Sequence, residues 1–521
     1  MTRRIGLDLD NTIIDYALPL AEALRREGFA PGATGGTTPS KQDAKRAVLG
    51  RDGDEGWQRI QGWIYSTGID LAEPFPGVHE FLVRCATAGD EVHIVSHKTE
   101  HGHFDRSGRS LRDAATAWLR ASGVVGDGTW QVRPERVHYE PTQDDKVARI
   151  AALGLDAFVD DLDEVLRHPS FPATVRRLKF GADGARDGIE VVGSWREAGD
   201  ALLGAAGAAE VGAMLEHLGA VTSAASVATI GGGTNSRVFT LESPVGRIVA
   251  KRYPDRHGDR RNRCRTEATA AAWMHGHGLP VARPLWWDDR VGLATFEWVD
   301  GTPSPTPDAG LVDAMLDVTA RLASLGAVAP AEFGLASEAC LSLGDLVGQV
   351  QSRIDVAGRS AWAPLAALAT GRLQRELDEA VRAASAAWPA PAHESLPPSE
   401  RVLSPSDFGS HNAVRTPDGD VFVDFEYFGW DDPAKLVGDA LLHPGMGLNH
   451  DLRRRWWHGS HTVFGGDAIE RARIVLPLLA LRWHVIVLKP FVGAGPFDHD
   501  SWDERCARAE RLRGIAVESP T

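Results

Sequence analysis

The sequence has few cysteines, no excess of basic charge and no apolar run long enough to cross a membrane. Its four cysteines lie far apart and form no Cys-x-x-Cys pair, so we predict free thiols in a reducing compartment. The 56 basic residues face 71 acidic ones, for a formal net charge of −15. This balance argues against a surface that binds nucleic acid or anionic membranes.

The apolar and N-terminal segments point to the same compartment. The longest apolar run, residues 474–488, is interrupted by Arg482 and His484 and is shorter than a membrane span. The first residues, Met-Thr-Arg-Arg, lead directly into a predicted strand and leave no room for a signal peptide. We therefore expect a cytoplasmic protein with neither a nucleic-acid nor a membrane partner.

What the sequence does contain is enough chain for several domains. Its 521 residues are 43% hydrophobic and 24% charged, an ordinary composition for a soluble protein and a length that suits about three units of about 150 residues. Acidic residues that directly follow short apolar strands recur in both halves of the chain. These strand-end acids are the features from which function can be inferred.

The first such pattern is a buried strand starting at residue 4 that ends in Asp8 and Asp10. A spacing of two directs both side chains toward one site at the carboxyl end of the strand, where a parallel sheet binds its ligands. Two adjacent negative charges repel each other, so the pair is costly unless a cation lies between them. The pattern therefore predicts a metal-dependent site.

Three further segments complete this pattern in the N-terminal half. A second strand ends at Ser96, Lys146 opens an amphipathic helix, and a third strand ends in acids. Taken singly, each is equally compatible with a strand cap or a solvated acid. Together with the Asp-x-Asp-x-Thr spacing of the first strand, the set resembles the four motifs of the haloacid dehalogenase-like phosphatases. The acids of the third strand are Asp160 and Asp161.

The resemblance implies a Rossmann-like parallel sheet and a role for each residue. Asp8 would attack phosphorus as the nucleophile and Asp10 would act as general acid and base. Ser96 would hold the phosphoryl oxygen, and Lys146 would balance the charge of the aspartate. Mg²⁺ would be bound by the acids of this site, and the sequence does not separate the last two of them. The predicted metal ligands are Asp8, Asp10, Asp160 and Asp161.

Two insertions interrupt these motifs. Residues 13–90 are too many for a loop, and residues 40–67 have a helical pattern with Trp57, Ile60 and Ile64 on one face. This segment resembles the helical cap that sets substrate specificity in the phosphatases. The second insertion, residues 97–109, is rich in histidine but matches no familiar metal-ligand spacing. It reads as a solvated loop or as a basic loop that faces the substrate.

Beyond residue 195 the phosphatase-like pattern stops, and residues 196–222 are predicted to be a helical linker. A strand, a glycine turn and a returning strand then follow from residue 227. Glycines let backbone amides approach a phosphate that a Cβ would block, although a plain hairpin turn has the same composition. The glycines are Gly231, Gly232 and Gly233.

The next segments add residues typical of a nucleotide site. Lys251 lies on a third strand, and Glu267 lies on the helix that follows. In kinases such a lysine reaches the nucleotide phosphates and the glutamate orients it; a surface lysine and a solvated glutamate are the alternatives. A later strand ends at Glu297, where the chain becomes a connector whose backbone could hydrogen-bond adenine.

The last pattern contains the residues that phosphoryl transfer requires. A short strand leads to Asp407, an asparagine follows five positions later at Asn412, and another strand ends in Asp424. We interpret Asp407 as the base that orients the acceptor hydroxyl, and Asn412 and Asp424 as Mg²⁺ ligands on the phosphates. Turn-forming residues between two hairpin strands are the competing interpretation.

From the glycine turn to Asp424, these residues occur in the order found in the aminoglycoside phosphotransferase and choline kinase-like kinases, which this part of the chain resembles. The resemblance covers residues 227–439, and C-terminal helices continue to about residue 509. One position departs from that family: Pro405 stands where a histidine normally precedes the catalytic aspartate by two residues. Acidic and histidine side chains beyond the motif are candidate acceptor contacts, namely Asp431, Asp432 and His443.

The sequence thus predicts a phosphatase-like domain over residues 1–195 with a cap at about 13–90. A bilobal α+β protein kinase-like domain is predicted over residues 223–521, its two lobes meeting near residue 300. We expect Mg²⁺ and ATP or GTP as cofactors and small hydroxylated metabolites as substrates, sugars or sugar phosphates by hypothesis. In the alternative, the chain is a small-molecule kinase whose front half is a regulatory or binding module.

Overall fold

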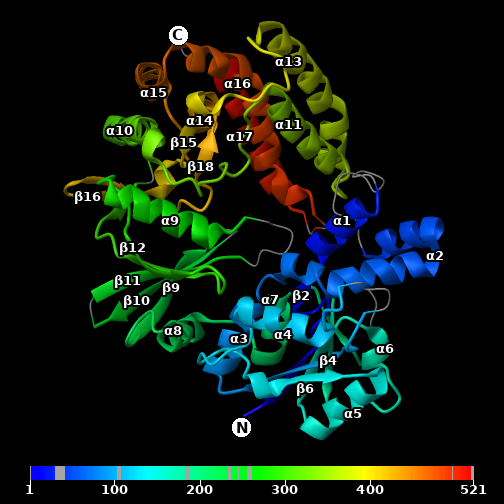
Figure 1. Ribbon diagram of the computed structural model, residues 1–521. Coiled ribbons are helices and arrows are strands. Elements are labelled where there is room, and N and C mark those ends of the chain that lie inside the picture. Colours follow the sequence, from blue (N-terminus) through cyan, green and yellow to red (C-terminus); the bar gives the residue numbers. More distant parts are fainter. Residues whose placement is uncertain are drawn as a thin grey trace. The chain divides into compact units, whose positions relative to one another are not determined.

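The structure is a computed structural model that describes residues 2–29, 41–102, 107–181, 188–232, 236–244, 246–254, 261–304, 306–493, 495 and 497–517. The chain divides into two compact units (Figure 1). The first unit comprises Met1–Asn262 with Trp286–Thr295, and the second unit comprises Arg263–Leu285 with Phe296–Thr521.

A six-stranded sheet forms the centre of the N-terminal part of the first unit. Its order is β5-β4-β1-β6-β7-β8, and every neighbouring pair is parallel. The parallel sheet predicted from the strand-end acids is therefore confirmed. Its strands are β1 (Arg4–Leu7), β4 (Glu91–His97), β5 (Val137–Glu140), β6 (Ala157–Asp160), β7 (Arg176–Phe180) and β8 (Glu190–Val192).

Helices cover both faces of this sheet because its strands are apolar on both sides (Figure 1). Ala157 and Val159 of β6 pack into one cluster, while Phe158 between them packs into another, as the period of two in a strand requires. One face is covered by α3 (Val78–Thr87), α4 (Leu111–Ala121) and α7 (Trp195–Leu203), and the other by α5 (Gln143–Leu153) and α6 (Asp163–Leu166).

The segment predicted as a cap contains α1 (Ala17–Arg26), α2 (Lys41–Tyr65) and the 3₁₀ turn η1 (Gly68–Leu71). Strands β2 (Ile14–Asp15) and β3 (Glu73–Pro74) pair antiparallel, so these helices leave the sheet and return to it at one point. The helical segment predicted for residues 40–67 is present as α2, which consists of two helices joined by a kink at Gly53, where φ is 67°. Helix α3, also inside the predicted cap range, contacts β4 and α7 and packs with the sheet.

A second sheet has the order β12-β13-β11-β10-β9. Helix α8 (Ala208–His217) packs against it through Val211, Met214 and Leu215. The strands are β9 (Ser226–Gly232), β10 (Arg237–Ser243), β11 (Gly246–Arg252), β12 (Pro284–Asp288) and β13 (Leu293–Glu297). In the division into two compact units, α7, α8 and β9 to β11 belong to the same unit as the N-terminal sheet. The domain boundaries predicted from the sequence at residues 195, 223 and 300 stay predictions.

The second unit is largely helical and is arranged around α16 (Gly466–Val487), which contacts five helices (Figure 1). These are α11 (Leu343–Gly358), α13 (Gln374–Ala387), α14 (Pro433–Leu442), α15 (His450–Phe464) and α17 (His499–Val517). The other helices are α9 (Arg263–Gly276), α10 (Ala309–Leu325) and α12 (Ala363–Leu368). Short strands complete the unit: β14 (Thr302–Pro303), β15 (Val402–Ser404), β16 (Ala413–Thr416), β17 (Gly419–Phe422) and β18 (Gly429–Asp431).

Across the described residues, no helix has both the length and the apolar character that a membrane span requires.

A buried histidine in α16 predicts a pH-dependent stability. His484 is 1% exposed, and neither ring nitrogen has a hydrogen-bond partner in the described part of the chain. Burial lowers its pKa to about 4, whereas the unfolded chain takes up the proton near pH 6.5. The contribution of this group to stability is therefore complete above pH 6.5 and is lost as the pH falls toward 4, by about 3 kcal/mol in total.

We expect His484→Leu to flatten this pH dependence. Chemical unfolding of wild type and variant between pH 7 and 4.5 should show the variant gaining relative stability as the pH falls. The exposed His450, replaced by leucine in the same way, should leave the wild-type profile unchanged. Parallel pH profiles for His484→Leu and wild type would contradict the prediction.

Candidate functional site

Three carboxylates meet at the carboxyl edge of the parallel sheet. Asp8 directly follows β1, Asp160 ends β6, and these two strands are neighbours in the sheet. Their carboxyl ends therefore lie side by side, and Asp161 joins them one residue later. One oxygen atom of each of the three side chains lies within 4.8 Å of the others.

Lys146 holds two of these acids together. It lies in the first turn of α5, whose N-terminus is capped by Thr142. Its ammonium donates to Asp8 Oδ1 at 2.6 Å and to Asp160 Oδ2 at 2.7 Å, and all three side chains are buried. Burial alone would lower the pKa of Lys146, but Asp160 and Asp8 raise it above its usual value. The lysine is therefore held as a cation.

Asp8 and Asp161 resist ionisation. Burial, with added repulsion from the neighbouring carboxylates, raises the pKa of Asp8 to about 8 although Lys146 opposes the shift. Burial and then Asp160 raise the pKa of Asp161 to about 6. One lysine does not balance this much negative charge, and oxygen donors in such an arrangement fit Mg²⁺. The site would gain from a divalent cation.

Ser96 brings an unsatisfied hydroxyl from the neighbouring strand. It lies in β4, which pairs with β1 on the side opposite β6. Ser96 is 1% exposed, and its Oγ has no hydrogen-bond partner among the described residues. Buried hydroxyls are normally paired, so this atom is available to a ligand that enters the site.

Asp10 contacts Tyr16, to which the sequence interpretation gave no role, and Lys98, which lies in the 97–109 segment interpreted as a solvated loop or as a basic loop that faces the substrate. The Tyr16 hydroxyl donates to Asp10 Oδ1 at 2.6 Å, and the Lys98 ammonium lies 2.8 Å from Oδ2. Lys98 is 4% exposed. Lys98 directly follows β4 and lies two positions after Ser96, and alternation that continues one residue past the strand is the signal that both side chains lie on one side.

The histidine-rich segment does not gather around a metal in the described residues. His97 Nε2 contacts the carbonyl of Pro141 at 3.1 Å, and His101 is exposed. Neither belongs to a group of potential metal ligands within the described ranges. His103 and Asp105 lie outside the residues that the structure describes.

In the second unit the structure brings Asp407, Asn412 and Asp424 together. Asp407 follows β15, and Asn412 ends the 3₁₀ turn η6 (Ser410–Asn412). The side-chain amide of Asn412 donates to the backbone oxygen of Asp407 at 2.9 Å. The backbone carbonyl of Asn412 accepts from the N–H of Val423, the residue before Asp424, at 2.9 Å. Asp424 has a φ of 68°, a backbone conformation common at functional sites.

Two glutamates extend this group. One oxygen each of Glu267, Asp424 and Glu426 lies within 4.8 Å of the others. Glu426 also accepts from Arg263 at 2.8 Å. Carboxylate and amide oxygens are the ligands that Mg²⁺ prefers, so the residues present fit the predicted ion, with Glu426 an addition that the sequence interpretation did not make.

Two imidazoles approach the carboxylate of Asp407. His443 Nε2 lies 3.0 Å from Oδ1 and His411 Nε2 lies 3.4 Å from it. Burial alone would raise the pKa of Asp407, but the hydrogen bonds from His411 and His443 hold it below its usual value. The same contact raises the pKa of His411. Asp407 is therefore held as a carboxylate.

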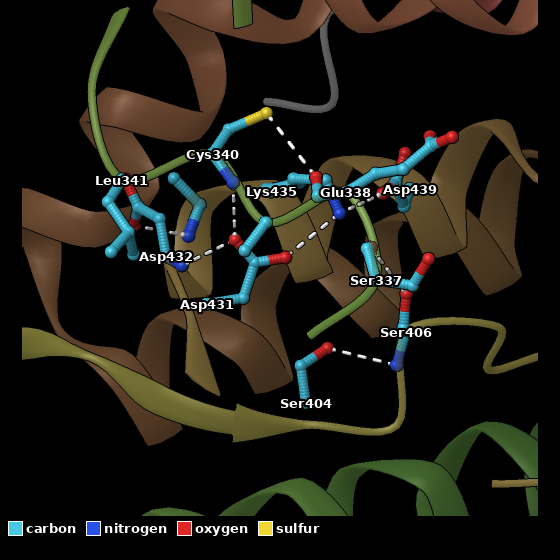
Figure 2. A network of polar contacts seen from close by, with 12 residues as sticks. Ser337, Glu338, Cys340, Leu341, Ser404, Ser406, Asp431, Asp432, Lys435 and Asp439 are labelled. Carbon is cyan, nitrogen blue, oxygen red and sulfur yellow. Dashed lines mark hydrogen bonds and ion pairs between the residues drawn. The ribbon is translucent and has the colours of Figure 1, made fainter. Parts of the chain in front are cut away.

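A buried polar network lies behind this loop (Figure 2). Asp431 is fully buried and accepts from Cys340 N, Asp432 N and Lys435 Nζ, each at 2.9 Å, and Lys435 also lies 3.0 Å from Asp439. Asp432 caps α14 through Ala434 N. Because Asp431 and Asp432 are occupied in this way, they hold the fold together and do not face an acceptor.

The predicted nucleotide-binding residues are spread over both units. Gly231 and Gly232 end β9, whereas Gly233 lies outside the described residues. Lys251 is buried in β11, with its ammonium 5.1 Å from the ring centre of Tyr253. Glu297 ends β13 and accepts from Arg283 N at 2.9 Å. These residues and Glu267 keep their predicted roles as proposals.

Comparison with known proteins identifies the C-terminal part of the chain. Residues 226–473 match the profile of the phosphotransferase enzyme family, which covers just under half of the chain. No curated protein matches. This part of the chain is therefore similar to small-molecule phosphotransferases, and its kinase-like α/β fold agrees with the prediction.

Solved structures give matches at low identity. A choline/ethanolamine kinase family protein from Mesorhizobium loti is 20% identical with a TM-score of 0.40, over 56% of this chain and 91% of that one. A choline kinase from Streptococcus pneumoniae is 14% identical with a TM-score of 0.40, over 58% and 97%. Amicoumacin kinase, solved with AMP-PNP and Ca²⁺, is 15% identical with a TM-score of 0.39, over 56% and 89%.

Proposed function

We propose that the chain is a nucleotide-dependent kinase that phosphorylates a hydroxyl group of a small molecule. The observation that carries the proposal is the hydrogen-bonded link from Asp407 through Asn412 to Val423, the residue before Asp424, inside a region that matches a phosphotransferase profile. Phosphoryl transfer needs a carboxylate near the acceptor and oxygen ligands for the metal. This set of side chains supplies both.

The role proposed for each residue is the one that its place in the sequence pattern predicts. Asp407 orients the acceptor hydroxyl and takes its proton as the new bond from the acceptor oxygen to the γ-phosphorus forms and the bond to the nucleoside diphosphate breaks. Asn412 and Asp424 would hold Mg²⁺, with Glu426 next to them. Mg²⁺, when bound, neutralises charge on the phosphates. Lys251, Glu267 and the backbone at Gly231 to Gly233 and Glu297 would bind ATP or GTP.

A screen of the full-length protein tests this function. ATP and GTP, each with Mg²⁺, are offered together with a library of sugars, amino alcohols and aminoglycosides, and nucleoside diphosphate release is compared with and without each acceptor. We expect release that depends on an acceptor. Release that depends on none of the acceptors would overturn the proposal, and release that persists unchanged in Asp407→Asn would remove Asp407 as the base.

A second activity is favoured by the site of the first unit. We propose that it hydrolyses phosphomonoesters, because the Lys146 ammonium lies between Asp8 and Asp160 at 2.6 and 2.7 Å and the buried Ser96 hydroxyl has no partner in the described residues. The strand order, read in chain order as 3-2-1-4-5-6, is that of Rossmann-like sheets and supports the resemblance to haloacid dehalogenase-like phosphatases.

The reaction would use the chain's own groups in two steps. Asp8 attacks phosphorus, the ester bond breaks, and Asp10 passes a proton to the leaving oxygen; water then hydrolyses the aspartyl phosphate. Ser96 and Lys146 would hold the phosphoryl oxygens. Mg²⁺ at Asp8, Asp160 and Asp161 would offset the charge that accumulates there. A sugar phosphate remains the hypothesis for the substrate.

Asp8→Asn is expected to abolish hydrolysis of a generic aryl phosphate, by at least about 10³-fold, because an amide cannot form the aspartyl phosphate. The variant should fold, since the change removes one of several buried negative charges, and thermal unfolding checks this. Asp144→Asn, at an exposed position of α5, is the matched control and should keep full activity.

The outcome also separates the two functions. A wild type that hydrolyses no phosphomonoester, or an Asp8→Asn variant as active as wild type, would remove the phosphatase. The first unit would then be a binding or regulatory module of a kinase. The phosphotransferase match supports this alternative better than a chain with both a kinase and a phosphatase activity on sugars.

A further inference from the structure

The carboxylate of Asp407 is contacted from a helix remote in sequence. The residues immediately before it are Ser404, Pro405 and Ser406; Ser406 has a φ of 66° and donates its N–H to Ser404 Oγ at 3.1 Å. Within the described residues, the side chains that reach the Asp407 carboxylate are imidazoles, and the closer belongs to His443 at the C-terminal end of α14. Among the described residues that precede Asp407 in the loop, none supplies such a contact, and the second imidazole belongs to His411, four residues after it.

The tautomer of His443 is determined by its second nitrogen. Gly445 N donates to His443 Nδ1 at 3.0 Å, so Nδ1 is the acceptor and the proton of the neutral ring lies on Nε2. That proton points to Asp407 Oδ1, 3.0 Å away. The contact is therefore a directed hydrogen bond from His443 to Asp407.

The same contact argues against a metal at this place. Asp407, His411 and His443 offer ligand atoms within 4.8 Å of one another, a set that could suit a transition metal. Binding a metal through Nε2 would require the proton of His443 to move to Nδ1, where the Gly445 N–H already donates. The hydrogen-bonded arrangement avoids that conflict.

Packing fixes the ring of His443 in this orientation. It stacks on His411 with ring centres 4.8 Å apart and 12° between planes, and it meets Trp483 edge to face with ring centres 4.9 Å apart. A Cβ at Gly409 would lie 2.6 Å from the His411 ring, and one at Gly445 would lie 3.0 Å from that of His443. The two glycines leave the space that the stacked rings occupy.

The buried network anchors this packing from behind. Trp483 Nε1 donates to Asp439 Oδ1 at 2.8 Å, and Asp439 is bound by Lys435, which also binds Asp431 (Figure 2). Asp431 belongs to β18, which pairs with β15 just before Asp407. The ring of His443 and the loop it contacts are thus attached to one buried cluster.

We propose that His443 is a positioning residue for Asp407, an inference that rests on the kinase function proposed above. Its Nε2–H fixes Oδ1 and so directs Oδ2 toward the acceptor hydroxyl. His411 packs against it and supports the same oxygen. The acceptor proton is then taken by an oxygen whose orientation is set by α14 and not by the residues that precede Asp407.

The test compares two substitutions in the full-length protein. His443→Leu removes the donor and is expected to lower kcat about 10- to 100-fold, as for other residues that orient a catalytic group, with KM for the nucleotide unchanged. His443→Gln keeps an N–H donor at a similar distance and should restore most of kcat. His450→Leu, at an exposed histidine, is the control and should match wild type.

A measurement without turnover decides the contact itself. Imidazole ¹⁵N and ¹H spectra of histidine-labelled protein should show one Nε2–H signal that disappears in His443→Gln and shifts in Asp407→Asn. A proton on Nδ1, or a signal that Asp407→Asn leaves in place, overturns the inference whether or not the wild type is an active kinase. Equal kcat for wild type and His443→Leu overturns it while the kinase function stands.

Discussion

Replacing Asp407 by asparagine is expected to lower nucleotide-dependent phosphorylation by about 10²- to 10⁴-fold, the usual contribution of a positioned base. Burial would raise the pKa of Asp407, but the hydrogen bonds from His411 and His443 lower it, so the wild type holds a carboxylate that can accept the hydroxyl proton. An amide of the same shape cannot take that proton. Steady-state phosphorylation of the best acceptor measures the change.

The controls for Asp407→Asn separate chemistry from binding and folding. Nucleotide affinity, measured by titration in the absence of acceptor, should stay within a few-fold of wild type, because the lost group acts on the acceptor side. Asp418→Asn, at an exposed turn between β16 and β17, should retain full activity. A fully active Asp407→Asn would remove Asp407 as the base and leave the kinase without an assigned proton acceptor.

The strand-end acids could be recognised from sequence because their spacing carries the geometry. Asp8 follows a short apolar strand and Asp160 ends another, and the carboxyl ends of neighbouring parallel strands always share an edge. Lys146 opens the helix that precedes the second of these strands. Local pattern and sheet topology therefore suffice to place these three side chains together.

The partners of these acids depend on contacts that no local pattern encodes. Lys98 reaches Asp10 across 88 positions, and His443 reaches Asp407 across 36 that include two hairpin strands and α14. Neither distance follows from the periodicity of one element. For Lys98 the two-residue offset from Ser96 was a usable signal, while for His443 the sequence offers only a histidine after a helix.

The acids after the kinase motif show the opposite error. Asp431 and Asp432 look like acceptor ligands because they are charged and follow Asp424, the predicted metal ligand. Lys435 is the signal for their role in the fold, since Asp439 follows it by four residues on α14, where residues i and i+4 face one another, and this buried lysine also binds Asp431. The structure buries this pair, with the pKa of Asp431 raised by burial although Lys435 opposes the shift.

Lys146→Met is expected to destabilise the first unit by about 3–5 kcal/mol, because it leaves the buried carboxylates of Asp8 and Asp160 without a counter-charge. Denaturant unfolding of the full-length protein measures the loss. The relevant transition is the one in which the fluorescence of Trp195, buried in the core of the parallel sheet, changes. Arg149→Met on the same helix breaks an ion pair with Glu140 whose arginine is 43% exposed and should cost at most about 1 kcal/mol.

The reason for the loss can be tested with a second substitution. If the cost of Lys146→Met is an uncompensated buried charge, then Asp8→Asn in the same chain should restore much of the stability, since it removes one of the buried acids while Asp160 keeps the backbone donor Leu162 N at 2.8 Å. Mg²⁺ should stabilise Lys146→Met more than wild type, because the ion replaces the missing positive charge. Additive losses in the double variant, or a Lys146→Met protein as stable as Arg149→Met, would mean that the lysine only fills space, and the three acids would then lose their assignment as a cation and phosphoryl site.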